Sequence, residues 1–76
     1  TATFDHCTFN ASAPVEGKAA IEIDSSMKLG VLYDVYINNC VATGFAPGSV
    51  SGNSLWNQKL GNKTNLWVDG IQKLTR

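Results

Sequence analysis

The chain has 76 residues, and its six basic and six acidic side chains balance to a formal net charge of zero. A chain of this length buries only about 60% of the surface that its unfolded form exposes, so it forms at most one domain with a marginal core. Its basic residues are scattered, unlike the stripe of a nucleic-acid or anionic-membrane binder, and no apolar run is long enough to span a bilayer.

The first half of the chain contains three strand candidates. Residues 1–4 have strand character from the outset, and Thr1 opens the chain without a signal peptide, so we expect a segment of a longer protein. Residues 20–23 alternate apolar and polar side chains, which places Ile21 and Ile23 on one face of a strand. Residues 24–29 could form a helical turn, whereas β-branched and aromatic residues favour a strand within 31–41.

The second half of the chain alternates loops and short strands. Residues 45–53 have a loop composition, with a turn at Pro47-Gly48, and residues 61–65 form a second turn. Strands are predicted at residues 54–57 and 66–68. Frequent glycines therefore divide the chain into short strands rather than helices.

An internal repeat is the main signal in this sequence. Residues 4–7 (Phe-Asp-His-Cys) match residues 37–40 (Ile-Asn-Asn-Cys) at an offset of 33, and residues 68–71 continue the series after a further 31. Residues 54–57 follow residues 20–23 at an offset of 34. The chain thus holds roughly two and a third copies of one unit, each with at least two short strands.

These units resemble the rungs of a right-handed parallel β-helix, as found in the pectin-lyase-like fold and in many large secreted or cell-surface bacterial proteins. The resemblance rests on a strand ending in Asn-Cys, a following Gly-Phe and the Gly-Lys-Ala-Ala-Ile-Glu-Ile segment, within residues 4–9, 17–24 and 36–45. It covers about half of the chain. It implies an extracellular or cell-surface location in a bacterium, with carbohydrate or adhesion contexts.

We therefore expect an all-β fold, a short right-handed parallel β-helix of about two to three coils, within one β-rich repeat domain of residues 1–76. A small antiparallel β-sandwich is the alternative. In a β-helix, equivalent residues stack about 4.8 Å apart. The expected inward ladders are Phe4–Ile37–Val68 and Cys7–Cys40–Ile71, and an outer polar ladder would contain Asp5, Asn38 and Asp69.

The chemically versatile side chains do not form a recognisable catalytic or metal-binding group. Cys7 and Cys40 are interpreted as small apolar residues stacked in adjacent coils, although stacked cysteines could bond if their geometry allowed. His6 is the only histidine and is expected on the surface or in a turn. Asp5 and Asp69, or Glu22 and Asp24, could serve as a carboxylate pair for glycoside hydrolysis, but solvated polar faces are the favoured interpretation.

The candidate ligand-binding residues are aromatic: Trp56, Trp67, Tyr33 and Tyr36. Flat aromatic side chains suit sugar surfaces because they combine a large apolar area with a polar edge. If Leu55, Leu66 and Val68 point inward, alternation along the strands places both tryptophans outside.

The sequence predicts a non-catalytic structural or adhesive module, without cofactor or metal. One alternative is a carbohydrate-binding module that uses the outward tryptophans, and a second is part of a β-helical polysaccharide lyase or hydrolase. The expected partners are a carbohydrate or a protein surface, with self-association or packing against a parent protein left open. Nucleic acid and a transmembrane segment are not expected.

Overall fold

The computed structural model describes residues 1–23, 33–59 and 64–75. These residues form eight strands and no helix, so the all-β class is confirmed. The predicted helical turn at 24–29 lies outside the described residues. The strands are β1 (Ala2–Asp5), β2 (Thr8–Asn10), β3 (Ile21–Ile23), β4 (Tyr33–Asn38), β5 (Val41–Thr43), β6 (Trp56–Gln58), β7 (Thr64–Val68) and β8 (Ile71–Leu74).

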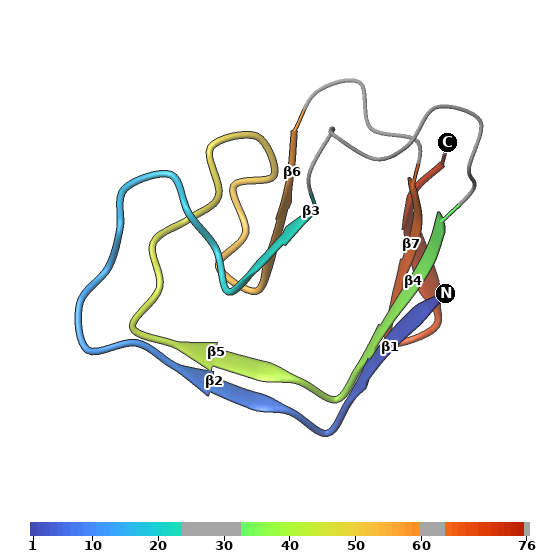
Figure 1. The fold of residues 1–76 in the computed structure, drawn as a ribbon, viewed down its shortest axis with the longest axis horizontal. Helices are drawn as coiled ribbons and strands as arrows, with labels where there is room; N and C mark the ends of the chain where they lie inside the picture. The colour runs from blue at the N-terminus through green and yellow to red at the C-terminus, as the bar shows by residue number, and fades with distance from the viewer. Residues whose placement is uncertain (24–32, 60–63, 76) are drawn as a thin grey trace.

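The described strands form three sheets, with the orders β1-β4-β7-β8, β2-β5 and β3-β6. All pairings in these sheets are parallel except that of β7 with β8. Viewed along its shortest axis (Figure 1), the chain runs through β1, β2 and β3, then beside them through β4, β5 and β6, and returns to the first sheet with β7. We call each of these successive passages a coil. An antiparallel sandwich, the alternative expectation, would lack these parallel ladders.

The repeat in the sequence sets the register of the first two sheets. Phe4 pairs with Ile37, and Ile37 pairs with Val68, at the predicted offsets. Thr8 pairs with Val41 at the same offset of 33 that separates Cys7 from Cys40. The alignment of one unit with the next was therefore visible in the sequence for these strands.

The third sheet departs from the predicted register by one residue. Ile21 pairs with Trp56, and Glu22 pairs with Asn57, so the offset between β3 and β6 is 35 instead of 34. Ten residues separate β2 from β3, whereas twelve separate β5 from β6. The longer second loop shifts the following strand, and this shift decides which side chains of β6 enter the interior.

The third coil ends in a hairpin, so the predicted Cys7–Cys40–Ile71 ladder is wrong at its last member. Val68 pairs with Ile71 in the antiparallel β7–β8 ladder. Asp69 and Gly70 have φ angles of 50° and 80°, and Asp-Gly with two positive φ angles is typical of a two-residue type I′ hairpin turn. The turn therefore reverses the chain, and Ile71 is exposed beside β7 instead of stacking on Cys40.

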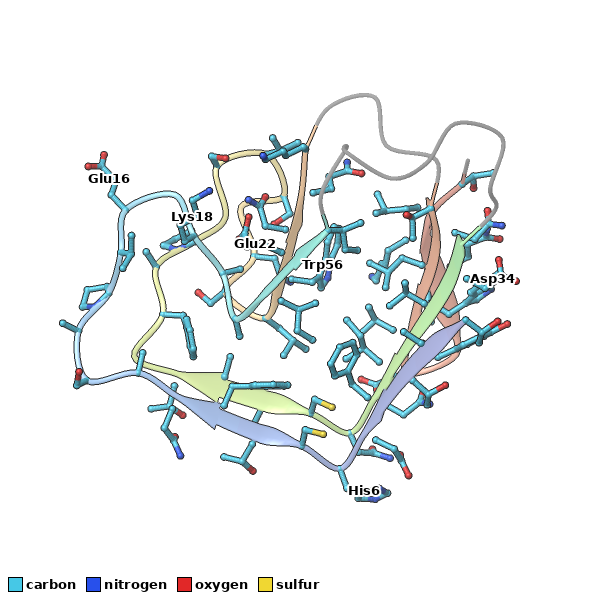
Figure 2. The ribbon with its side chains drawn as sticks, viewed as in Figure 1. His6, Glu16, Lys18, Glu22, Asp34 and Trp56 are labelled. Atoms are coloured by element: carbon cyan, nitrogen blue, oxygen red, sulfur yellow. The ribbon has the colours of Figure 1, made fainter. Side chains whose placement is uncertain are left out.

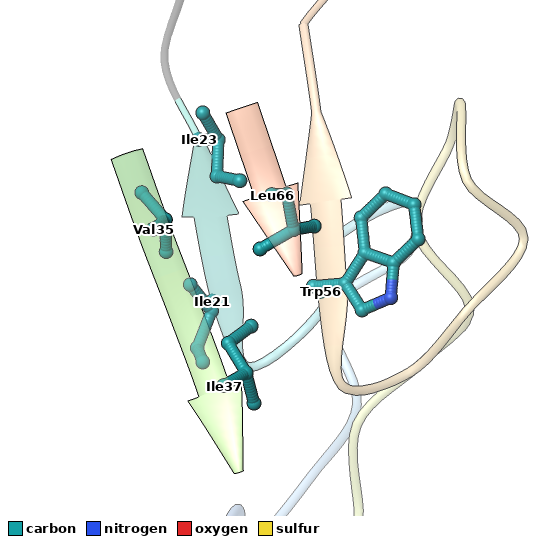
Figure 3. Packing of buried hydrophobic residues seen from close by; sticks show 6 residues of the cluster. All are labelled: Ile21, Ile23, Val35, Ile37, Trp56 and Leu66. Atoms are coloured by element: carbon teal, nitrogen blue, oxygen red, sulfur yellow. The ribbon is translucent and has the colours of Figure 1, made fainter. Parts of the chain in front are cut away.

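The core lies between β3 and β6 on one side and β4 and β7 on the other. Figure 3 shows the buried cluster of six side chains. Its members are Ile21, Ile23, Val35, Ile37, Trp56 and Leu66. Full burial of an aliphatic side chain contributes about 1.5–3 kcal/mol, so this small cluster contributes substantially to the stability of the described part of the chain. Ile37 and Leu66, in the middle and third coils, are fully buried.

Candidate functional site

Two of the four predicted binding residues meet on the outer face of the four-stranded sheet. Tyr36 of β4 and Trp67 of β7 are register partners. Their strand neighbours Val35, Ile37 and Leu66 are buried in the interior. Because side chains alternate along a strand, both rings point outward. The orientation predicted for Trp67 is therefore confirmed.

The two outward rings stack on one another. Their centroids are 4.9 Å apart and their planes differ by 11°. Each ring consequently has one face covered by the other, and both side chains are only partly exposed. Aromatic pairs contribute about 0.5–1.5 kcal/mol beyond their area burial. The stack thus joins β4 to β7, whatever else it binds.

The aromatic pair belongs to a row that crosses the whole sheet. Thr3 pairs with Tyr36, and Gln72 pairs with Trp67, and both of these polar residues are exposed. We call Thr3, Tyr36, Trp67 and Gln72 the outer aromatic row. Its composition, two aromatic rings between a hydroxyl and a carboxamide, suits a ligand with both apolar surface and hydroxyl groups.

A polar pair lies beside the outer aromatic row. Asp34 and Asn65 precede Tyr36 and Trp67 by two residues and therefore share their face of the sheet. Asn65 Nδ2 donates a hydrogen bond of 3.0 Å to Asp34 Oδ1, and Figure 2 shows Asp34 on the outer side of the sheet. A carboxylate and an amide thus flank the rings.

Trp56 does not belong to this face, and its predicted outward orientation is wrong. Its side chain is 9% exposed and lies inside the coil (Figure 2). The prediction assumed that Leu55 points inward, which an offset of 34 would place beside Ile21, but Trp56 is the residue that pairs with Ile21, at an offset of 35. A shift of one residue moves every side chain of a strand to its opposite face, so Trp56 follows Ile21 into the core.

Tyr33, the fourth predicted residue, opens β4 and pairs with Thr64. Its side chain lies outside the described part of the structure. Asp24, the partner proposed for Glu22, also lies outside the described residues.

A hydrogen-bonded centre around Asn57 was missed by the sequence analysis. Asn57 is 2% exposed, and its Oδ1 accepts hydrogen bonds of 3.1 Å from the backbone N–H groups of both Val50 and Ser51. Its Nδ2 donates to Glu22 Oε1 at 3.0 Å and to Gly17 O at 3.3 Å. The carboxamide therefore uses its full capacity of two donated and two accepted hydrogen bonds.

Glu22 is exposed, as expected for an outward polar side chain, and it also takes part in this centre. Besides accepting from Asn57, its Oε2 accepts a hydrogen bond of 2.7 Å from the backbone N–H of Ala19. The two carboxylate oxygens thus connect the loop before β3 to strand β6 in the next coil. The sequence shows only that Trp56 and Asn57 are adjacent, so their side chains face opposite sides of a strand. That both side chains are buried is visible only in the structure.

The loop before β6 packs directly on this centre. A Cβ atom built on Gly48 would lie 2.4 Å from Cγ of Asn57, so only glycine fits beneath the carboxamide. Gly48 also forms an isolated parallel bridge with Gly17, and Ser49 N donates to Gly17 O at 2.9 Å. The loops of the two coils therefore continue the stacking where no named strand is present.

The corner between β1 and β2 carries the exposed His6. The residue has a φ of 54°, matched by 53° at Asn39 one coil later, so each corner contains a left-handed residue. His6 Nδ1 lies 3.0 Å from Asp5 Oδ1, with both side chains largely exposed, and Figure 2 shows His6 projecting away from the coil. This placement agrees with the expected surface or turn position.

Asp69 stabilises the corner of the preceding coil, at Asn39. Its Oδ1 accepts a hydrogen bond of 2.8 Å from the backbone N–H of Asn39, and its own N–H donates to Ile37 O at 2.8 Å. Asp5 pairs with Asn38 in the β1–β4 ladder. The predicted outer polar ladder is thus in place at Asp5 and Asn38, while the Asp69 carboxylate is bound to the backbone of the corner at Asn39.

Cys7 and Cys40 stack in adjacent coils with free thiols. The backbone N–H of Cys7 donates to Cys40 Sγ at 3.4 Å, and Cys40 Sγ donates to the carbonyl oxygens of Phe4 and Asn38 at 3.4 and 3.3 Å. Cys40 also packs against the core cluster. The stacking predicted for these residues is confirmed, whereas their expected full burial is not, because both side chains are only partly buried.

Among the described residues, no group of three or more His, Cys, Asp or Glu side chains is placed to hold a metal ion. Within the same residues, every buried side-chain nitrogen and oxygen has a hydrogen-bond partner, and no helix is suited to crossing a membrane. None of the protein-family models, curated proteins and solved structures compared with this chain matches it.

Proposed function

We propose that the chain is a non-catalytic structural or adhesive module of a secreted or cell-surface bacterial protein, formed by short coils of a right-handed parallel β-helix. The observation that carries this proposal is that polar side chains form hydrogen bonds within the fold. Glu22, Asn57 and Asp69 direct their oxygen and nitrogen atoms to backbone groups and to one another, across coils. Hydrogen bonds of this kind stabilise a scaffold.

The parallel stacking supports the same proposal. A coil cannot bury its apolar side chains alone, and stacked neighbours create a continuous core. Among the described strands, each parallel ladder links residues that are 31 to 35 positions apart. The resulting stack is a scaffold that holds the outer face of the four-stranded sheet in a fixed shape.

A second candidate function is carbohydrate binding, favoured by one observation. Tyr36 and Trp67 lie outside the core, side by side, with Asp34 and Asn65 adjacent. Sugar recognition uses aromatic surface together with a few polar groups that fix orientation. The mutual stacking of the rings reduces the face available to a sugar, which is why this candidate stands second.

One experiment separates these functions. The 76-residue chain is titrated with a panel of soluble polysaccharides while tryptophan fluorescence is recorded, and new reducing ends are assayed in the same samples. We expect no saturable spectral shift and no new reducing ends. The Tyr36→Ala and Trp67→Ala variants should show lower thermal stability, because the stack between β4 and β7 is lost.

The alternatives predict other outcomes. A saturable shift that disappears in Trp67→Ala, with the circular dichroism spectrum unchanged, would replace the structural module by the carbohydrate-binding module. New reducing ends that disappear in Asp5→Asn or Asp69→Asn would contradict the non-catalytic proposal. Trp56→Phe is the matched control, because it removes an indole from the core and leaves the outer aromatic row intact.

A further inference from the structure

The first coil presents three strands with one unpaired side each. Strands β1, β2 and β3 are each terminal in their sheets. Hydrogen bonds from the N–H groups of His6, Ala11 and Ile21 run toward the second coil. Since N–H groups alternate in direction along a strand, those of Thr3, Asp5, Thr8 and Asn10 point away from it. We call this side of the first coil the β1–β2–β3 edge.

The side chains at the β1–β2–β3 edge are covered on one side only. Phe4 is partly buried, whereas its ladder partner Ile37 in the middle coil is fully buried. Phe4 and Phe9 contact each other edge to face, with ring centroids 6.2 Å apart, and pack against the core. The apolar core therefore ends at the β1–β2–β3 edge in the aromatic rings of Phe4 and Phe9.

The opposite end of the same sheet is closed in a different manner. There β8 turns back on β7, its pairing contains a register irregularity, and it carries Lys73. Bulges and lysines are devices that protect an edge strand against further pairing. The β1 sequence, Ala-Thr-Phe-Asp, contains neither lysine nor proline, and its pairing with β4 is regular.

We propose that the β1–β2–β3 edge docks a further polypeptide coil with the same strand–corner–strand pattern, in parallel and in register. This inference rests on the proposed structural module and names its partner. The second coil pairs with the first through parallel strands on both sides of a left-handed corner. The β1–β2–β3 edge presents the same strand directions and the same kind of corner, at His6, to a further coil. The docked coil would place an apolar side chain over Phe4 and another over Phe9.

A second copy of this chain does not fit the edge. The three sheets contain four, two and two strands, because β7 and β8 both join the same sheet. If a second copy stacked along the same axis, its β1 would lie against β8 of this chain. Its β2 and β3 would then have no strand of this chain beside them. Two first coils facing each other about a two-fold axis would pair β1 with β1 in the antiparallel direction, which loses the register of the corners.

The test uses a fluorescein-labelled peptide of residues 33–43 carrying Cys40→Ser, added to the full 76-residue chain. Fluorescence anisotropy should rise and saturate. In Thr3→Pro the outward N–H of β1 is removed without loss of a hydrogen bond to β4, and we expect the dissociation constant to rise about tenfold or more. Thr3→Ala is the matched control and should bind within about twofold of the parent chain.

Amide hydrogen exchange provides a second, independent measurement. Peptide binding should slow exchange at Thr3, Asp5, Thr8 and Asn10, whose N–H groups point outward, in the parent chain and in Thr3→Ala. If Thr3→Pro fails to fold, Thr8→Pro takes its place, since the same argument applies to β2.

The docking inference is overturned if the peptide does not bind, if Thr3→Pro and Thr3→Ala bind equally, or if exchange at the outward amides is unchanged. A dimer in sedimentation that excludes the peptide would assign the edge to a second copy and also overturn it. The outer aromatic row and the β1–β2–β3 edge share Thr3, but the two assays change different groups: the polysaccharide assay removes the Tyr36 and Trp67 rings, and the peptide assay removes an outward backbone N–H of β1 or β2. Failure of one proposal can therefore be told from failure of the other.

Discussion

Trp56 lies beside Ile21 in the parallel β3–β6 ladder, and both side chains are buried in the core. The next residue, Asn57, lies beside Glu22 and is buried on the other face, under the loop that contains Val50 and Ser51. Strand β6 therefore has an apolar core on one side and a hydrogen-bonded centre on the other. This short strand, which follows the long connection from β5, depends on both.

Trp56→Ala should destabilise the chain much more than Trp67→Ala. Removing a buried tryptophan costs about 3–5 kcal/mol, while loss of a partly exposed aromatic pair costs about 0.5–1.5 kcal/mol. Urea denaturation followed by circular dichroism measures the two free energies of unfolding. Equal losses for both variants would contradict the inward position of Trp56.

Fluorescence of single-tryptophan variants checks the same assignment. In Trp67→Phe the remaining Trp56 should emit at shorter wavelength than free tryptophan and be poorly quenched by iodide, because it is buried. In Trp56→Phe the remaining Trp67 should emit at longer wavelength and be quenched more readily. The reverse order would place Trp56 on the surface.

Gly48→Ala should be strongly destabilising because the new Cβ would lie 2.4–2.5 Å from three atoms of the Asn57 side chain. The Asn57 carboxamide cannot move away without breaking hydrogen bonds to Val50 and Ser51, each worth about 1 kcal/mol. We expect a loss of about 2 kcal/mol or more, in the range of overpacked positions, measured by urea denaturation. Asn57→Ala combined with Gly48→Ala should lose less than the sum of the single changes, since the contacts with Cγ and Oδ1 are then absent and only the contact with Cβ of residue 57 remains.

Asn57→Ala alone should lower the free energy of unfolding by about 2–3 kcal/mol, because the backbone groups that it satisfies lose their partner. Asn10→Ala is the control: Asn10 is exposed on β2, and its replacement should change stability by less than about 0.5 kcal/mol. Chemical denaturation of both variants tests the prediction. A loss no larger than that of the control would show that the Asn57 hydrogen bonds do not stabilise the fold.

Asp69→Asn should retain stability, whereas Asp69→Ala should lose about 1–2 kcal/mol. Asparagine tolerates the positive φ of a type I′ turn and keeps an oxygen that can accept from the Asn39 N–H. Alanine has neither property, and a left-handed conformation costs an L-residue roughly 1–2 kcal/mol. Thermal unfolding compares the pair. Equal melting temperatures for both variants would argue against the capping role of the carboxylate.

Local patterns in the sequence were enough to determine the all-β class and most of the register. The Phe4–Cys7 and Ile37–Cys40 segments align because each contains an inward apolar residue, a left-handed corner and a stacked cysteine at the same spacing. The outward position of Trp67 followed from alternation around Leu66. These features depend on side-chain periodicity and corner chemistry, which are properties of short segments.

Tertiary structure alone decided the register of β6, the hairpin that ends the third coil and the hydrogen-bond partners of the polar residues. The loop before β6 is two residues longer than its counterpart in the first coil, and only the packed position of Asn57 beneath Gly48 shows how that length is accommodated. At Asp69-Gly70 the same corner position becomes a hairpin, because two successive positive φ angles reverse the chain where one bends it. Contacts between residues 31 to 40 positions apart set these outcomes, and no local pattern specifies which distant backbone group a polar side chain will meet.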